Sequence, residues 1–177
     1  MSSKPVTSVA FLRGVNVGGH RKIAMNDLKQ WLLEAGFSKV ATYIQSGNVA
    51  LEHPAGLDVA TAVRRALAEH PDGDVPVVVR TSDEVLRVEA SNPYPDADHT
   101  RLHVAFLAKA PEEAALSAAL ERSWQPEEFR VVGRDVYLFL PAGMGRSTMV
   151  PRLGIIKGAT TRNWNTVLSL ADLVRNF

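Results

Sequence analysis

The stretch Val9-Ala10-Phe11-Leu12 recurs, residue for residue, as Val104-Ala105-Phe106-Leu107 in the second half of this 177-residue chain. Each copy is a short run of β-branched, aromatic and aliphatic residues, which is typical of a buried β-strand. A match of four residues carries little weight by itself. The predicted elements that follow the two copies also come in a matching order, so we predict a duplicated fold.

After the first copy, the pattern predicts the element order β-α-β-β-α-β. The predicted elements are a strand at 7–12, a helix opened by Asn26 and ended by Gly36, strands at 40–45 and 49–52, a helix at 59–67 and a strand at 76–80. The turn Ser46-Gly47-Asn48 joins the two middle strands, because Gly and Asn supply the positive φ angles of a hairpin. This order is that of the ferredoxin-like split βαβ fold.

The second half restarts this plan and then departs from it. Its predicted elements are strands at 104–107, 129–132 and 136–140, a helix from Pro111, and a helix capped by Thr160 or Thr161 in place of a clear last strand. The expected fold class is therefore α+β, with two tandem ferredoxin-like (βαββαβ) halves, the second with a modified helical C-terminus. We expect the first half at 1–81, a linker helix and loop at 82–100, and the second half at 101–177. Thr81 and Glu84 suit a capping box at the start of the linker helix.

Acidic residues are absent from two long stretches, although the formal net charge is only +1. Residues 1–26 and 136–171 each contain four basic residues and no Asp or Glu, so the rest of the chain carries a net charge of −7. Each stretch also contains a glycine-rich loop, at 14–22 and at 143–147. Positive charge beside exposed backbone N–H groups favours an anionic ligand. We therefore expect the two stretches to meet and form one basic concavity.

The candidate ligand-binding residues lie in these loops, in the predicted hairpin turn and at the predicted start of the last helix. They are Arg13, Gly14, Asn16, Gly18, Gly19, Lys22, Gln45, Ser46, Asn48, Gly143, Gly145, Arg146, Ser147, Thr161, Arg162 and Asn163. The glycine spacing fits neither a dinucleotide fingerprint nor a P-loop. Each group also has a plainer interpretation, as a turn with solvated basic residues or as a helix cap.

No catalytic constellation or metal site stands out. His20 is a catalytic candidate, because it lies in the first glycine-rich loop and an imidazole group is suited to proton transfer near neutral pH. His99 and His103 have i,i+4 spacing, but His103 begins a predicted strand, so we predict no metal site there. The sequence identifies no cofactor and does not indicate an oligomeric state.

The composition restricts the class of protein. The absence of cysteine removes disulfides, thiolate zinc sites and cysteine nucleophiles, and it favours the cytoplasm. No stretch approaches the roughly 20 apolar residues of a membrane span. We therefore expect a soluble cytoplasmic protein that has no membrane partner.

Three motifs together carry a family resemblance. Residues 11–19, 43–49 and 161–167 (FLRGVNVGG, YIQSGNV and TRNWNTV) resemble a bacterial family catalogued as domain of unknown function 1697, and the similarity extends over nearly the whole chain. The resemblance implies an α+β protein with two ferredoxin-like halves. It implies no activity, substrate or catalytic residue.

The leading functional hypothesis is a binding protein for a phosphate-bearing small ligand such as a nucleotide. Only 7% of the residues are aromatic, so surface for stacking the bases of single-stranded nucleic acid is scarce. The alternatives are an enzyme that acts on a phosphorylated or nucleotide substrate through His20 or Ser147, and a nucleic-acid-binding module. A protein-interaction module is a further possibility.

Overall fold

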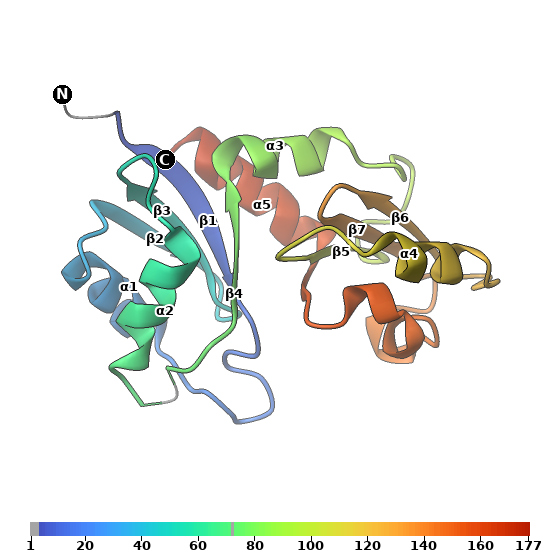
Figure 1. The fold of residues 1–177 in the computed structure, drawn as a ribbon, viewed down its shortest axis with the longest axis horizontal. Helices are drawn as coiled ribbons and strands as arrows, with labels where there is room; N and C mark the ends of the chain where they lie inside the picture. Colours follow the sequence, from blue (N-terminus) through green and yellow to red (C-terminus); the bar gives the residue numbers. More distant parts are fainter. Residues whose placement is uncertain (1–3, 72) are drawn as a thin grey trace. The chain divides into compact units, whose positions relative to one another are not determined.

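The computed structural model describes residues 4–71 and 73–177 (Figure 1). The chain divides into two compact units, one containing Met1–Leu86 and Leu170–Phe177 and the other Arg87–Ser169. Each unit has one four-stranded antiparallel sheet, and the fold class is α+β. Two helices, Ser82–Ala90 (α3) and Trp164–Arg175 (α5), contribute residues to both units.

The first unit has the element order that the sequence predicts. Its elements are Val6–Leu12 (β1), Met25–Glu34 (α1), Lys39–Tyr43 (β2), Asn48–His53 (β3), Val59–Ala68 (α2) and Val77–Thr81 (β4). The strands lie in the order β2-β3-β1-β4, so β1 pairs with both β3 and β4. The end of β1 therefore lies next to the β2–β3 turn and the start of β4.

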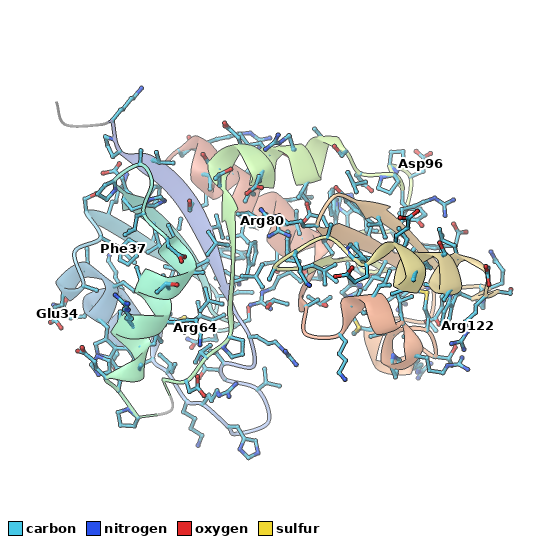
Figure 2. All side chains as sticks on the ribbon, in the orientation of Figure 1. Glu34, Phe37, Arg64, Arg80, Asp96 and Arg122 are labelled. Carbon is cyan, nitrogen blue, oxygen red and sulfur yellow. The ribbon has the colours of Figure 1, made fainter. Side chains whose placement is uncertain are left out.

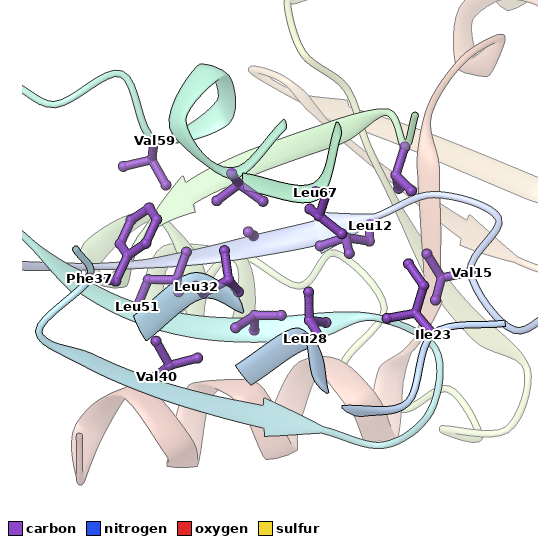
Figure 3. Close-up of a cluster of buried hydrophobic side chains, with 14 residues drawn as sticks. Leu12, Val15, Ile23, Leu28, Leu32, Phe37, Val40, Leu51, Val59 and Leu67 are labelled. Atoms are coloured by element: carbon purple, nitrogen blue, oxygen red, sulfur yellow. The ribbon is translucent and has the colours of Figure 1, made fainter. Parts of the chain in front are cut away.

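The core of the first unit lies between its sheet and helices α1 and α2 (Figure 3). Because side chains alternate along a strand, Ala10 and Leu12 of β1 both face this core. Leu28 and Leu32 of α1 are spaced i,i+4 and therefore share one helical face. Leu67 of α2 is buried in the same core. The apolar periodicity of the sequence is sufficient to place these three elements.

The helix termini follow the sequence in part. The capping box is confirmed: Glu84 Oε2 accepts from the Thr81 backbone N–H at 2.8 Å, and Thr81 Oγ1 accepts from Glu84 N–H at 3.2 Å. The prediction that Asn26 caps α1 is wrong. The N-cap is Ala24, whose carbonyl accepts from Leu28 N–H at 3.0 Å, so Asn26 lies inside the first turn.

The second unit repeats the strand order of the first. Its elements are Leu102–Phe106 (β5), Glu113–Leu120 (α4), Glu128–Val132 (β6), Asp135–Phe139 (β7), three short 3₁₀ helices (Met144–Arg146, Val150–Arg152 and Gly154–Ile156) and Thr160–Asn163 (β8). The sheet order is β6-β7-β5-β8. The 3₁₀ helices cover the same face of the sheet as α4, where Met149, Leu153 and Ile155 join the core.

The prediction of a helix in place of the last strand is wrong. Residues 160–163 form β8, in which Thr160 pairs with Phe106 and Arg162 pairs with Val104. The side chain of Asn163, not that of Thr160 or Thr161, caps α5, and its Oδ1 accepts from Thr166 N–H at 2.8 Å. A four-residue segment that reads Thr-Thr-Arg-Asn has no apolar alternation, so its strand conformation depends on pairing with β5.

Equivalent strands of the two units carry equivalent residues. Val9 pairs with Arg80 of β4, and Val104, at the same place in the repeated stretch, pairs with Arg162 of β8. In both arginines Nη1 donates to the carbonyl of the preceding residue, at 2.9 Å for Arg80 and 3.0 Å for Arg162. Arg80, labelled in Figure 2, is only 1% exposed. The similarity between the two units therefore extends beyond the four identical residues.

None of the helices in the described part of the chain is both long and apolar enough to cross a membrane.

Candidate functional site

A finger, Asn16–Arg21, projects from the connection between β1 and α1. Asn16 N–H donates to the Arg21 carbonyl at 3.0 Å, and His20 N–H donates to the Val17 carbonyl at 3.1 Å. At its tip Gly18 and Gly19 have φ angles of 60° and 79°, as the two central residues of a type I′ turn require. Val17 is 63% exposed, and the two glycines and His20 are exposed as well. The finger is therefore a hydrogen-bonded turn with glycines at its tip.

Asn16 fixes the finger to its surroundings. Its Nδ2 donates to the carbonyls of Ile23 and Gln45, both at 2.8 Å, and its Oδ1 accepts from Ile23 N–H at 2.9 Å. Its φ of 56° lies in the left-handed region, which Asn tolerates better than most residues. Through these hydrogen bonds the Asn16 amide holds the two ends of the loop together and joins the finger to the β2–β3 turn.

The β2–β3 turn rests directly on the end of β1. Leu12 N–H donates to the Gly47 carbonyl at 2.8 Å, and a Cβ added at Gly47 would lie 2.8 Å from Leu12 Cβ. Only glycine fits this position, because its φ is also positive at 78°. Ile44 has a φ of 49° and is 49% exposed, a strained conformation for a β-branched residue. The turn therefore presents Ile44 and exposed Gln45 beside the finger.

Asn48 and Ser46 hold this turn closed. Asn48 is fully buried, and its Nδ2 donates to the Tyr43 carbonyl at 3.1 Å and to Ser46 Oγ at 2.9 Å. Asn48, like Asn16, is predicted from the sequence to contact a ligand, and in the structure its side chain forms hydrogen bonds within the turn. Of the candidate residues in this turn, Gln45 has the most accessible side chain.

The loop that contains the finger is basic, and its positive charge has no internal compensation. We call Arg13–Lys22 the basic loop. Arg13, His20 and Lys22 are exposed, and Arg21 Nη1 lies 3.5 Å from the Arg13 carbonyl. Within residues 4–71 and 73–177, none of these four side chains forms an ion pair. Gly14 has a φ of 71° and lets the chain turn away from β1 into the loop.

In the second glycine-rich loop, Ser147 and its neighbours bind a carboxylate of the same chain. Glu127, only 6% exposed, accepts through Oε2 from Met149 N–H at 2.7 Å, from Thr148 N–H at 3.1 Å and from Thr148 Oγ1 at 3.2 Å. Burial raises the pKa of Glu127, but hydrogen bonds from Ser147, Met149 and Thr148 outweigh burial and leave the pKa below its ordinary value. This loop is an anion-binding geometry whose anion is Glu127.

The other candidates of this loop differ in accessibility. Gly143 has a φ of 87°, and a Cβ added there would lie 2.9 Å from Arg101 Nη1. Gly145 and Arg146 are exposed. Arg146 forms no ion pair with any residue that the structure describes.

The candidates of the last motif lie on β8. The sequence predicts that Arg162 lies at the start of the last helix. In the structure Arg162 lies on a strand, where burial lowers the pKa of its guanidinium to about 10. Thr161 is partly buried, and the side chain of Asn163 is the cap of α5. Glu127 and Arg80 are not predicted from the sequence, since no local pattern indicates a buried charge whose partners are distant in the chain.

No group of three or more His, Asp or Glu side chains is placed to hold a metal ion in the described ranges, 4–71 and 73–177.

Comparison with known proteins assigns the chain to a family. The model described as Protein of unknown function (DUF1697) matches residues 6–137, so the chain belongs to this family. The match includes the basic loop and the β2–β3 turn. The chain is also similar to a solved structure, that of a conserved bacterial protein from Streptococcus pneumoniae. The TM-score is 0.79 and the sequence identity is 17%, and the match covers 97% of this chain and 99% of that chain. At this identity the similarity shows the fold alone. No curated protein matches the chain.

Proposed function

We propose that the basic loop binds a small phosphate-bearing ligand such as a nucleotide. One observation carries the proposal: the exposed turn Gly18-Gly19 lies in a loop that also contains Arg13, Arg21 and Lys22, and none of these three cations has an ion-pair partner in the described part of the chain. Backbone N–H groups at a glycine turn and fixed cations are the groups that recognise phosphate oxygens.

The exposure of these cations sets the strength of binding. An exposed charge pair contributes roughly 0.2–1 kcal/mol, because water screens it. Three such contacts, together with hydrogen bonds from the turn, therefore support weak binding. The Debye length is about 8 Å at physiological salt, so we expect the affinity to fall as salt is added.

The frame of the loop favours binding by limiting the entropy cost. The three hydrogen bonds of Asn16 hold the finger on the β2–β3 turn before any ligand arrives. A loop that is already ordered loses less conformational freedom on binding than a mobile one. The left-handed residues Asn16 and Ile44 support the same view, because strained backbone often accompanies functional sites.

The test is a titration with ATP and with inorganic pyrophosphate, followed by protein NMR at low and at physiological salt. We expect both probes to shift the amide signals of Val17–His20, with a lower affinity at the higher salt. The double variant Arg13→Ala/Lys22→Ala should lose most of this binding. The matched control is Lys29→Ala/Arg64→Ala, which removes two exposed cations from α1 and α2 and should bind like the wild type. Equal loss in both double variants would contradict the proposal.

His20 separates binding from catalysis. His20→Gln leaves the three cations of the loop in place, so we expect ATP affinity to stay within about twofold. ATP hydrolysis that is present in the wild type and absent from His20→Gln would instead favour the enzyme. Binding of single-stranded RNA in preference to ATP would favour the nucleic-acid module.

We also propose a fold for each unit and a cytoplasmic location for the protein. We propose that the two units are ferredoxin-like copies, and their equal strand orders and the equivalent pairs Val9–Arg80 and Val104–Arg162 support this. The absence of cysteine supports a cytoplasmic location.

A further inference from the structure

We propose that the second unit has its own ligand site, a hollow beside α4 that binds a small organic monocarboxylate. The hollow measures about 310 Å³ and lies between the β5–α4 connection and the segment that precedes β8. We call it the α4 hollow; Figure 1 labels β5 and α4, which the first of these segments connects. The proposal does not depend on the basic loop, which belongs to the first unit.

The walls of the α4 hollow are mostly apolar. Leu107 and Ile155, which are 6% and 7% exposed, belong to the core of the second unit and also line the hollow. Pro111 and Ala115 line it from the side of α4. A ligand with an aromatic or aliphatic body therefore exchanges water for apolar contact here.

The charges of the lining select a single negative charge. Lys109 pairs with Glu112 at 3.2 Å, which leaves Lys157 as the uncompensated cation. Lys157 forms no ion pair with any residue that the structure describes. A carboxylate supplies the one charge that is needed, whereas a phosphate dianion would carry a second charge close to Glu112. Lys157 belongs to the acid-free stretch 136–171.

The connection beside the hollow differs from its counterpart in the first unit. In the first unit the residues after Leu12 include Val15 and Ile23, both buried in the core. In the second unit the connection after Leu107 is shorter, and none of its residues 108–112 belongs to the core cluster. The second copy therefore lacks the buried apolar side chains that this connection contributes in the first.

The α4 hollow is larger than three other hollows of the described residues. These measure about 180, 250 and 270 Å³, and the smallest adjoins the α4 hollow, with which it shares Ala115, Gly154 and Ile155. Pockets for small ligands begin at roughly 300 Å³. Among these four, only the α4 hollow reaches that size.

The test compares benzoate with its neutral analogue benzamide, by NMR titration of the full chain. We expect benzoate to shift the amide signals of Lys109, Glu112 and Gly158, and to bind more tightly than benzamide. Lys157→Gln should weaken benzoate about fivefold and leave benzamide unchanged. Ala115→Leu should fill the hollow and abolish binding of both probes, while its matched control Ala114→Leu, one residue earlier on α4 and outside the lining, should bind like the wild type.

Specific outcomes overturn the proposal. Benzoate that shifts only signals of the basic loop, or that binds Lys157→Gln as well as the wild type, rules out this site. Failure of the basic-loop proposal is seen separately, because Arg13→Ala/Lys22→Ala should leave benzoate binding unchanged. If Ala115→Leu does not fold, the comparison of Lys157→Gln with the wild type still decides.

Discussion

Asn16 illustrates how one polar side chain can hold a loop that has little apolar surface. Its amide makes three hydrogen bonds, to Ile23 and to the β2–β3 turn, and its backbone is left-handed. The sequence marks Asn16 as a ligand contact because it lies between glycines in a basic loop. The structure gives it a supporting role, which depends on Gln45, 29 residues away.

We expect Asn16→Ala to destabilise the protein by about 2–4 kcal/mol, because three hydrogen bonds are lost and Ala is strained in the left-handed region. Urea unfolding measures the change. The matched control is Asn26→Ala, at an exposed position in the first turn of α1, which should change stability little. An Asn16→Ala variant as stable as Asn26→Ala would show that the three hydrogen bonds of Asn16 contribute nothing to stability.

Glu127 makes stability depend on pH. Its pKa is lower in the folded protein than in the unfolded chain, so its ionised carboxylate stabilises the fold at pH above the unfolded pKa, near 4.5. This contribution is lost as the pH falls through the lower folded pKa. We expect Glu127→Gln to cost about 2 kcal/mol at neutral pH and much less in acid. Urea unfolding of the wild type and the variant at several pH values measures the difference.

The matched control for this experiment is Glu128→Gln, the neighbouring carboxylate on β6. It should not show the same pH-dependent difference from the wild type. A difference for Glu127→Gln that is constant down to strongly acid pH would contradict the proposed role of its ionised form.

At the scale of elements, α5 depends on the residue that ends β8. Asn163 closes the strand by pairing with His103, and its side chain caps the helix. We expect Asn163→Ala to cost about 1 kcal/mol of stability, as the loss of an N-cap does. The exposed Asn165 lies in the first turn of the same helix, so Asn165→Ala is the control and should be nearly neutral. Thermal unfolding followed by circular dichroism distinguishes the two variants.

The elements also differ in how far the sequence predicts them. The periodic helix α2 and the apolar strand β1 follow from local pattern, because their own residues supply the buried face. The polar strand β8 does not, because its conformation is set by β5, more than 50 residues earlier. The candidate site divides in the same way: turn chemistry predicts Gly18 and Gly47, whereas the partner of Ser147, Glu127, is determined by tertiary packing.

At the scale of the whole molecule, the last residues of the chain complete the first unit. Leu170 and Ala171 are fully buried, and Lys39 Nζ lies 4.5 Å from the ring centroid of Phe177. From the sequence we expect 101–177 to form one half, because the apolar stripe of a helix does not indicate which sheet the helix packs on. We expect Leu170→Ala to cost about 2–5 kcal/mol.

Urea unfolding tests this cost, with Leu173→Ala, at a partly buried position of the same helix, as the milder comparison. A Leu170→Ala variant that unfolds together with the wild type would show that the end of α5 contributes little to the first unit.

The division of the first unit between the two ends of the chain has a consequence for biosynthesis. The ribosome synthesises residues 1–86 early. It synthesises the segment 170–177, which belongs to the same first unit, only after the whole of the second unit. The second unit is continuous from 87 to 169, so its synthesis begins and ends between the two parts of the first. During translation, therefore, the unit whose synthesis begins first is the unit whose last residues are added last.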